Sequence, residues 1–194
     1  MPEPSLHLAM SQPVLVIHGA GEPRRRGRRV FWEPLLGDAL GPAYRVRAPR
    51  MPDPEHPDDR TWRERIAQLV SEADHPVLVG HSFGASTLLR FVAQAEPQPD
   101  FRGLFLVATP FWGKDFPDFA LTAEHLRRLQ AMSPLFFYQS ADDPIVGLTH
   151  FRKYQKSLPH AVFRRLDGRG HEFDQETFPE LVADIRSIAG PQAA

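Results

Sequence analysis

One short motif combines a nucleophile with the space that its chemistry requires. The motif is Gly-His-Ser-Phe-Gly, with Ser82 at its centre and glycines at positions 80 and 84. An apolar run at residues 76–79 precedes it, and an amphipathic pattern at residues 86–95 follows it. A nucleophile at a tight strand-to-helix turn needs small neighbours, and the free N–H groups of the helix start favour negative charge there. The context predicts Ser82 as the nucleophile of an acyl-transfer reaction.

A serine hydroxyl attacks well only when a histidine takes its proton and a carboxylate orients that histidine. Around such strand-turn-helix nucleophiles the chain order is nucleophile, acid, histidine. Among nine histidines, this order favours His171, which lies in a glycine-flanked loop at residues 167–173. His150 and His160 also follow the acid, but they lie in a helical pattern and at a strand start. We therefore expect His171 to be the general base.

The acid is expected in the Ser-Ala-Asp-Asp-Pro segment that follows an apolar run at residues 135–138. The residues alone leave Asp142 and Asp143 open, and Asp167 is the best alternative near the histidine. The aspartate that does not orient the histidine would cap the turn or face solvent.

Backbone N–H groups must stabilise the oxyanion that acyl transfer creates. The N–H of Phe83 is one expected donor. The second should come from the glycine-containing loop at residues 18–22, most favourably from Ala20 and less so from Gly21. We expect His18 to hydrogen-bond within that turn and the His81 side chain to point away from the site.

Alternating strands and helices would position these groups. Apolar runs predict strands at residues 14–17, 44–47, 76–79, 103–107, 135–138 and 161–166. Apolar spacings of three and four predict helices at residues 61–73, 86–95, 123–132 and 179–189. Runs that are apolar on both faces suit a parallel sheet with helices on each side. The fold class is therefore α/β, with about six mostly parallel strands.

Composition narrows the possibilities further. The chain has 194 residues, 42% of them hydrophobic and 24% charged, with a formal charge of -1 and no cysteine. Thiolate nucleophiles, disulfides and cysteine-bound metals are excluded. We expect one domain over residues 1–194 with its core at about 13–189, a cytoplasmic location, no membrane span and no nucleic-acid partner.

The chain resembles the α/β-hydrolases, in particular small bacterial members and the retinoblastoma-binding-protein-type serine hydrolases. The resemblance runs from residue 14 to about 189 and rests on Val-Ile-His-Gly at 16–19, the Ser82 motif, Asp-Asp-Pro-Ile-Val at 142–146 and Gly-Arg-Gly-His at 168–171. It implies Asp143 rather than Asp142 as the acid. It also implies strand order 4-3-5-6-7-8 of the larger fold, with the first two strands missing, and neither a metal nor an organic cofactor.

Two further segments bear on the substrate. Phe111 and Trp112, in an aromatic stretch that also holds Phe116 and Phe119, are candidates for lining an acyl pocket, although they could equally be local core. The stretch at residues 109–120 is too short for a lid domain. Five arginines at residues 24–29 could attract anions, but charge runs are usually solvated, and we favour that interpretation.

The sequence thus predicts a serine carboxylesterase with the triad Ser82, Asp143 and His171, acting on a small-molecule acyl substrate as a monomer or homodimer. An amidase, peptidase or thioesterase on the same triad is an alternative, because leaving-group choice depends on loop shape. A protein-interaction module that retains an inactive triad is the non-enzymatic alternative.

Overall fold

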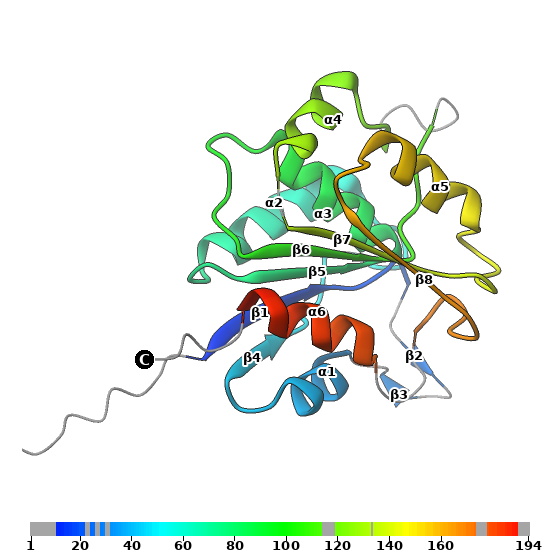
Figure 1. The fold of residues 1–194 in the computed structure, drawn as a ribbon. Coiled ribbons are helices and arrows are strands. Elements are labelled where there is room, and N and C mark those ends of the chain that lie inside the picture. The colour runs from blue at the N-terminus through cyan, green and yellow to red at the C-terminus, as the bar shows by residue number, and fades with distance from the viewer. Residues whose placement is uncertain are drawn as a thin grey trace, which may run out of the picture.

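A parallel sheet of six strands forms the centre of the fold (Figure 1). The structure is a computed structural model that describes residues 11–21, 24–25, 28–29, 32–113, 119–132, 134–173 and 178–189. The strands are β1 (Gln12–Ile17), β4 (Tyr44–Arg47), β5 (Val77–His81), β6 (Gly103–Val107), β7 (Leu135–Ser140) and β8 (Val162–Leu166). They lie in the order β4-β1-β5-β6-β7-β8. Both the six strands and the order implied by the resemblance are confirmed.

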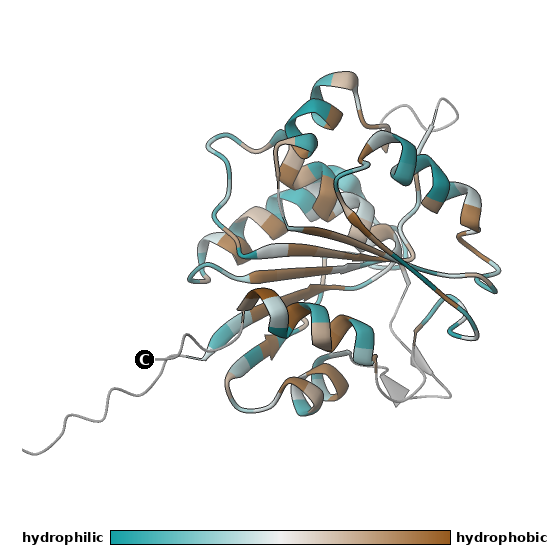
Figure 2. Cartoon of the chain, in the orientation of Figure 1, coloured by the Kyte–Doolittle hydropathy of each residue, from teal (hydrophilic) through white to brown (hydrophobic). Residues whose placement is uncertain are grey.

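Side chains alternate between two buried faces along each central strand. In β1, Val14 and Val16 pack on one side of the sheet, whereas Leu15 and Ile17 pack on the other. Every residue of β5, β6 and β7 is buried, and Figure 2 shows the apolar strands between more polar layers. Because both faces of the sheet are covered, the sequences of these strands are continuous apolar runs and do not alternate between apolar and polar residues.

Helices cover the two faces unequally. On one face lie α2 (Asp59–Ser71), α3 (Ser82–Gln94), α4 (Ala123–Gln130) and α5 (Leu148–Ser157). On the other lie α1 (Trp32–Leu40) and α6 (Pro179–Ala189) (Figure 1). This arrangement confirms the α/β class with helices on both sides. None of the helices in the described ranges is both long and apolar enough to cross a membrane.

The structure differs from the expected elements in four places. The sequence does not predict helix α1, and it indicates α5 only by the helical pattern around His150. Helix α3 begins at Ser82, four residues before its expected start. Within the arginine segment, the backbone of β2 (Arg24–Arg25) pairs antiparallel with β3 (Arg28–Arg29). The arginine side chains themselves, like residues 114–118 of the aromatic segment, lie outside the described residues.

Candidate active site

The turn between β5 and α3 holds Ser82 in a strained backbone conformation. Strand β5 ends at His81, and Ser82 is the first residue of α3. The backbone φ of Ser82 is 52°, in the left-handed region that residues other than glycine rarely adopt. Such strain is typical of functional turns, where the surrounding structure imposes it. The expected strand-turn-helix setting of Ser82 is thus present.

The two glycines of the motif are required by close packing. A Cβ at position 84 would lie 2.1 Å from the carbonyl oxygen of His18, and one at position 80 would lie 2.6 Å from the Cα of Ala85. Real Cβ atoms do not approach other atoms so closely, so neither site accepts a side chain without displacement of the backbone. The glycines therefore allow the turn, the helix start and the loop after β1 to meet.

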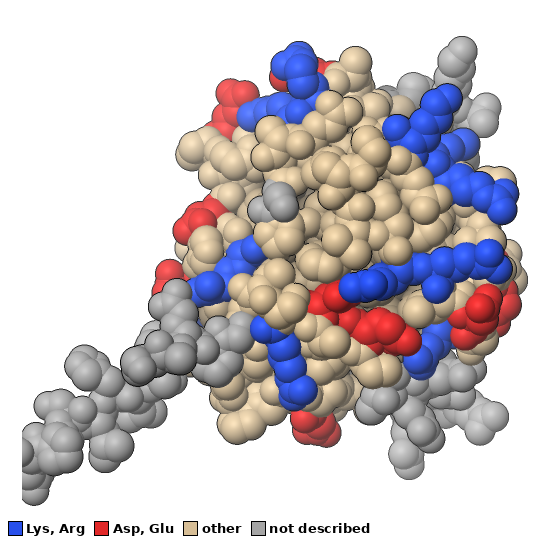
Figure 3. Space-filling view, in the orientation of Figure 1, with Lys and Arg blue, Asp and Glu red and all other residues tan. Residues whose placement is uncertain are grey.

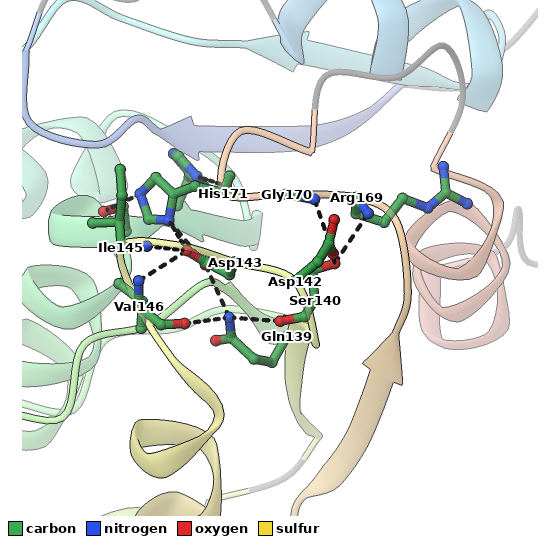
Figure 4. A network of polar contacts seen from close by, with 11 residues as sticks. Gln139, Ser140, Asp142, Asp143, Ile145, Val146, Arg169, Gly170 and His171 are labelled. Carbon is green, nitrogen blue, oxygen red and sulfur yellow. Dashed lines mark hydrogen bonds and ion pairs between the residues drawn. The ribbon is translucent and has the colours of Figure 1, made fainter.

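Three side chains from different loops form a hydrogen-bonded chain at this turn. His171 Nε2 lies 3.0 Å from Ser82 Oγ. On the other side of the ring, His171 Nδ1 lies 2.9 Å from Asp143 Oδ2 and 3.0 Å from Oδ1 (Figure 4). Both His171 and Asp143 are buried. The structure therefore brings together the serine, the histidine and one of the aspartates that the sequence singles out.

Asp143 is held as a carboxylate by the turn that follows β7. Its Oδ1 accepts the backbone N–H groups of Ile145 and Val146, each at 2.8 Å, and its Oδ2 accepts Gln139 Nε2 at 2.9 Å. Burial alone would raise the pKa of Asp143, but the hydrogen bonds from His171, Val146 and Ile145 outweigh it and lower that pKa. The negative charge therefore faces His171.

The alternative acids have other contacts. Asp142 is exposed, hydrogen-bonds to the Ser140 hydroxyl and accepts the Gly170 N–H at 3.3 Å. The Ser140 hydroxyl in turn accepts the N–H of Arg169 at 3.0 Å. Asp142 therefore holds the loop that carries His171, without contacting the ring. Asp167 is also exposed, and it faces Arg165 at 3.8 Å.

Two buried polar residues contact Asp143 or His171, and the sequence does not single them out as supporting residues. Gln139 bridges Asp143 and the carbonyl oxygen of Val146, at 2.9 and 2.7 Å. It could have been noticed as a polar residue at the end of an otherwise apolar run.

His81 is the second such residue, and the expectation that its side chain points away from the site is wrong. Its Nε2–H donates to the His171 carbonyl oxygen at 2.8 Å, and the two ring centroids are 5.0 Å apart. Burial, together with the nearby His171, lowers the pKa of His81 from 6.5 to about 4. His81 is therefore a neutral donor that fixes the backbone of His171.

The loop after β1 runs beside Ser82. A Cβ at Gly19 would lie 3.1 Å from the Ser82 Cβ. His18 donates from Nδ1 to the Gly19 carbonyl at 2.7 Å and accepts the Met51 N–H at 3.4 Å, so it shapes the turn as expected. The Gly21 N–H donates to the Pro54 carbonyl at 2.6 Å. Because that N–H is engaged, the loop favours Ala20 as the oxyanion donor, which remains a prediction.

The oxyanion role of Phe83 also remains a prediction. Its N–H belongs to the first turn of α3, where helix N–H groups lack acceptors within the helix. The Phe83 ring contacts Phe119, with centroids 5.7 Å apart, and Phe119 contacts Trp112 at 5.3 Å. A row of contacting aromatic rings thus leads from Phe83, the residue after Ser82, to Trp112, one of the pocket candidates.

Phe111, the other pocket candidate, lies against α5. Its N–H donates to His150 Nδ1 at 2.9 Å, and its ring meets Tyr154 with centroids 4.9 Å apart. Phe111 and Trp112 are half-buried and pack against the core as well. A pocket-lining role for them stays a prediction, and Phe116 lies outside the described residues.

Polar contacts join α6 to the strands β7 and β8 and to the loop that carries His171. Asp184 on α6 accepts Tyr138 Oη at 2.7 Å and Arg164 Nη2 at 2.8 Å, while Glu180 faces Arg169 at 3.5 Å. Figure 3 shows blue side chains in rows over α5 and β8, with red ones beside the latter.

Within the described ranges, no three His, Asp or Glu side chains form a group that could hold a metal ion.

Comparison with known proteins decides the family. A profile described as serine hydrolase matches residues 14–181. The chain belongs to the serine hydrolase family. The matched range runs from β1 to the first turn of α6. The family match therefore includes all six strands of the sheet and the loops that hold Ser82, Asp143 and His171 in this serine hydrolase.

Similar proteins agree with this assignment. The serine hydrolase is 23% identical over 181 residues to YdeN of Bacillus subtilis (strain 168), with 89% of this chain and 92% of YdeN covered. The crystal structure of the ydeN gene product matches with a TM-score of 0.75, covering 92% of this chain and 98% of that one.

Two other solved structures share the fold at lower sequence identity. They are 2-hydroxy-6-oxo-6-phenylhexa-2,4-dienoate hydrolase of Rhodococcus sp. strain RHA1 (TM-score 0.72, 16% identity, 92% of this chain and 90% of that chain) and the thioesterase domain from the curacin biosynthetic pathway (TM-score 0.64, 16% identity, 92% of each chain). At such identity these structures establish the α/β-hydrolase fold of this serine hydrolase and nothing about its substrate.

Proposed function

We propose that this serine hydrolase cleaves small carboxylic esters through an acyl-enzyme on Ser82. The observation that carries the proposal is the hydrogen-bonded chain from Ser82 Oγ through His171 to Asp143, at 3.0 and 2.9 Å, starting from a serine with φ of 52°. A serine, a histidine and a buried carboxylate in this order form the arrangement that acyl transfer requires.

The contacts of His171 define its tautomer. With Asp143 deprotonated, His171 donates Nδ1–H to the carboxylate, and Nε2 is left with a lone pair facing the Ser82 hydroxyl. As Ser82 Oγ bonds to the ester carbonyl carbon, its proton moves to Nε2, and the carbonyl π electrons move to oxygen. Asp143 then stabilises the imidazolium, while the N–H groups of Ala20 and Phe83 stabilise the oxyanion.

Collapse of this tetrahedral species releases the alcohol. The carbonyl re-forms, the bond to the leaving oxygen breaks, and His171 gives its proton to that oxygen. Water then attacks the acyl carbon as His171 accepts one of its protons, which gives a second tetrahedral species. The bond from that carbon to Ser82 Oγ then breaks, and His171 returns its proton to Oγ, which releases the acid and restores Ser82. In this scheme Phe111 and Trp112 line the side where the acyl group lies.

A fluorophosphonate probe tests the nucleophile directly. The folded protein should be labelled stoichiometrically at Ser82, because the probe reacts only with an activated serine. Ser82→Ala should abolish labelling and lower kcat for ester hydrolysis by on the order of 10³-fold or more. Folded, unlabelled protein would overturn the enzymatic proposal and favour the interaction-module alternative.

A panel of leaving groups tests the substrate class. p-Nitrophenyl esters, thioesters and anilides with the same acyl group should be hydrolysed with the highest kcat/KM for the oxygen ester. Thioesters belong in the panel because a thioesterase domain shares the fold. Faster thioester or anilide cleavage that Ser82→Ala abolishes would retain the triad and replace the ester assignment.

A further inference from the structure

An exposed apolar side chain stands in the turn that carries the acid. Among the described residues, three large hydrophobic side chains are exposed: Leu35 at 44%, Ile145 at 67% and Val162 at 37%. Ile145 is the most exposed of them, and it lies two residues after Asp143. Single exposed apolar residues are common on protein surfaces, so exposure alone indicates no function. The position of Ile145 in the fold is the informative observation.

The position of Ile145 is fixed by the site itself. Its backbone N–H donates to Asp143 Oδ1 at 2.8 Å, and the N–H of the buried Val146 donates to the same oxygen. Asp143 in turn contacts His171 Nδ1 at 2.9 Å. Figure 4 shows Ile145 beside this pair. The backbone contacts that hold the acid therefore also hold an apolar side chain in solvent next to the triad.

The sheet order separates the two sides of the reacting carbonyl. Ser82 follows β5, the loop with the expected oxyanion donor Ala20 follows β1, and the Asp143 turn follows β7. In the sheet, β1 lies on one side of β5, whereas β6 and β7 lie on the other. The loop after β1 and the Asp143 turn after β7 therefore approach Ser82 from opposite sides. When the carbonyl oxygen of a bound ester points towards the loop after β1, the rest of the ester lies on the side of Ser82 where His171 is.

Proton transfer then decides which substituent is near Ile145. His171 must protonate the leaving oxygen, so that oxygen has to lie within hydrogen-bond reach of Nε2. The alcohol part of the ester therefore extends from the His171 side of the nucleophile, where the Asp143 turn presents its exposed side chain. We infer that Ile145 is a specificity-determining residue that contacts the alcohol group, and that the preferred leaving alcohol is apolar. This inference rests on the proposed ester hydrolysis.

Two ester series separate the alcohol side from the acyl side. The first series comprises acetates of alcohols from methyl to hexyl, and the second comprises methyl esters of acids from acetic to hexanoic. In the parent protein kcat/KM should rise along the alcohol series. Ile145→Ala should lose on the order of tenfold on hexyl acetate but less than about twofold on methyl acetate. The dependence on acyl length should not change.

The variants are chosen so that folding does not confuse the result. Any residue except proline at position 145 keeps the N–H that binds Asp143, and Ile145→Leu should restore the preference for long alcohols. Leu35→Ala is the matched control, because Leu35 is also exposed but lies on α1, outside the site. It should leave both series unchanged.

The possible failures are distinguishable. Equal losses on methyl and hexyl acetate, an unchanged alcohol series, or a change confined to the acyl series would each overturn the role of Ile145 while ester hydrolysis stands. Absence of hydrolysis in both series, with Ser82 unlabelled by the fluorophosphonate probe, would overturn the proposed function and this inference together.

Discussion

At the scale of single residues, the adjacent aspartates 142 and 143 have different roles because their surroundings differ. The Asp143 carboxylate is buried and accepts hydrogen bonds from His171, Gln139 and two backbone N–H groups. Asp142 is exposed and accepts from the Gly170 backbone. A neutral amide can replace Asp142 as an acceptor, whereas a group that orients an imidazole and balances its positive charge needs a carboxylate.

Substitution of each aspartate by asparagine should therefore have unequal effects. Asp143→Asn removes the charge and places an amide NH₂ against His171 Nδ1, which favours the wrong tautomer and should lower kcat by on the order of 10³- to 10⁴-fold. Asp142→Asn should change kcat by less than about tenfold, because its oxygen can still accept the Gly170 N–H. Steady-state ester hydrolysis checks this, with thermal unfolding as the folding control. A crippled Asp142→Asn protein beside an active Asp143→Asn protein would reverse the assignment.

The main side chains of the site could be predicted from the sequence, but the contact of His81 could not. Ser82, His171 and the pair of aspartates could be predicted to lie together because their order along the chain is the order of nucleophile, acid and histidine expected around a strand-turn-helix nucleophile. The contact between His81 and the carbonyl of His171 joins residues 90 positions apart. No local pattern reports such a contact. The choice between Asp142 and Asp143 came from resemblance alone, since both follow the same strand.

At the scale of elements, prediction succeeded where burial dominates. The central strands were found because both of their faces are apolar, and α2 and α6 because one of their faces is. Helix α1 was missed because Pro34 and Gly37 lower its intrinsic helix propensity, and only Leu36 and Leu40 among its residues are buried. The start of α3 was placed too late, because the strained φ of Ser82 lets the helix begin directly after the strand.

Two glycine substitutions test how the elements around Ser82 pack together. Gly84→Ala places a methyl group 2.1 Å from the His18 carbonyl oxygen, so α3 and the loop after β1 must separate, at a cost of ~3 kcal/mol or more in the free energy of unfolding. Gly37→Ala, in α1, meets nothing closer than Val46 at 3.9 Å and should stabilise the protein by ~0.5–1 kcal/mol.

Denaturant unfolding measures both changes, and ester hydrolysis reports the local effect. Gly84→Ala should lose most activity even where it is folded, because the displaced loop carries the Ala20 N–H. Gly37→Ala should retain full activity. Equal stability and activity of the two variants would show that the turn tolerates a side chain and that the packing described at Gly84 is not essential.

At the scale of the whole molecule, ionisation couples the site to stability at acid pH. Burial, with the nearby His171, lowers the pKa of His81 from 6.5 to about 4, so in the folded protein His81 stays neutral to lower pH than in the unfolded chain. Between these two values the unfolded state binds more protons, and the free energy of unfolding falls as pH falls. Asp184 adds to this below pH 4: burial would raise its pKa, but the bonds from Arg164 and Tyr138 lower it.

His81→Gln should separate these contributions. Glutamine can still donate a hydrogen bond to the His171 carbonyl but does not titrate, so the loss of stability between pH 6.5 and about 4 should shrink by up to about 3 kcal/mol. Urea unfolding at successive pH values measures this loss.

From pH 7 to 9 the free energies of unfolding of the parent and the variant should run parallel, because His81 is neutral in both the folded and the unfolded state of the parent. Below pH 4 both should still lose stability as Asp184 protonates and releases Arg164. An unchanged slope between pH 6.5 and 4 would mean that His81 titrates alike in the folded and unfolded chains, which is incompatible with its burial as a neutral donor beneath His171.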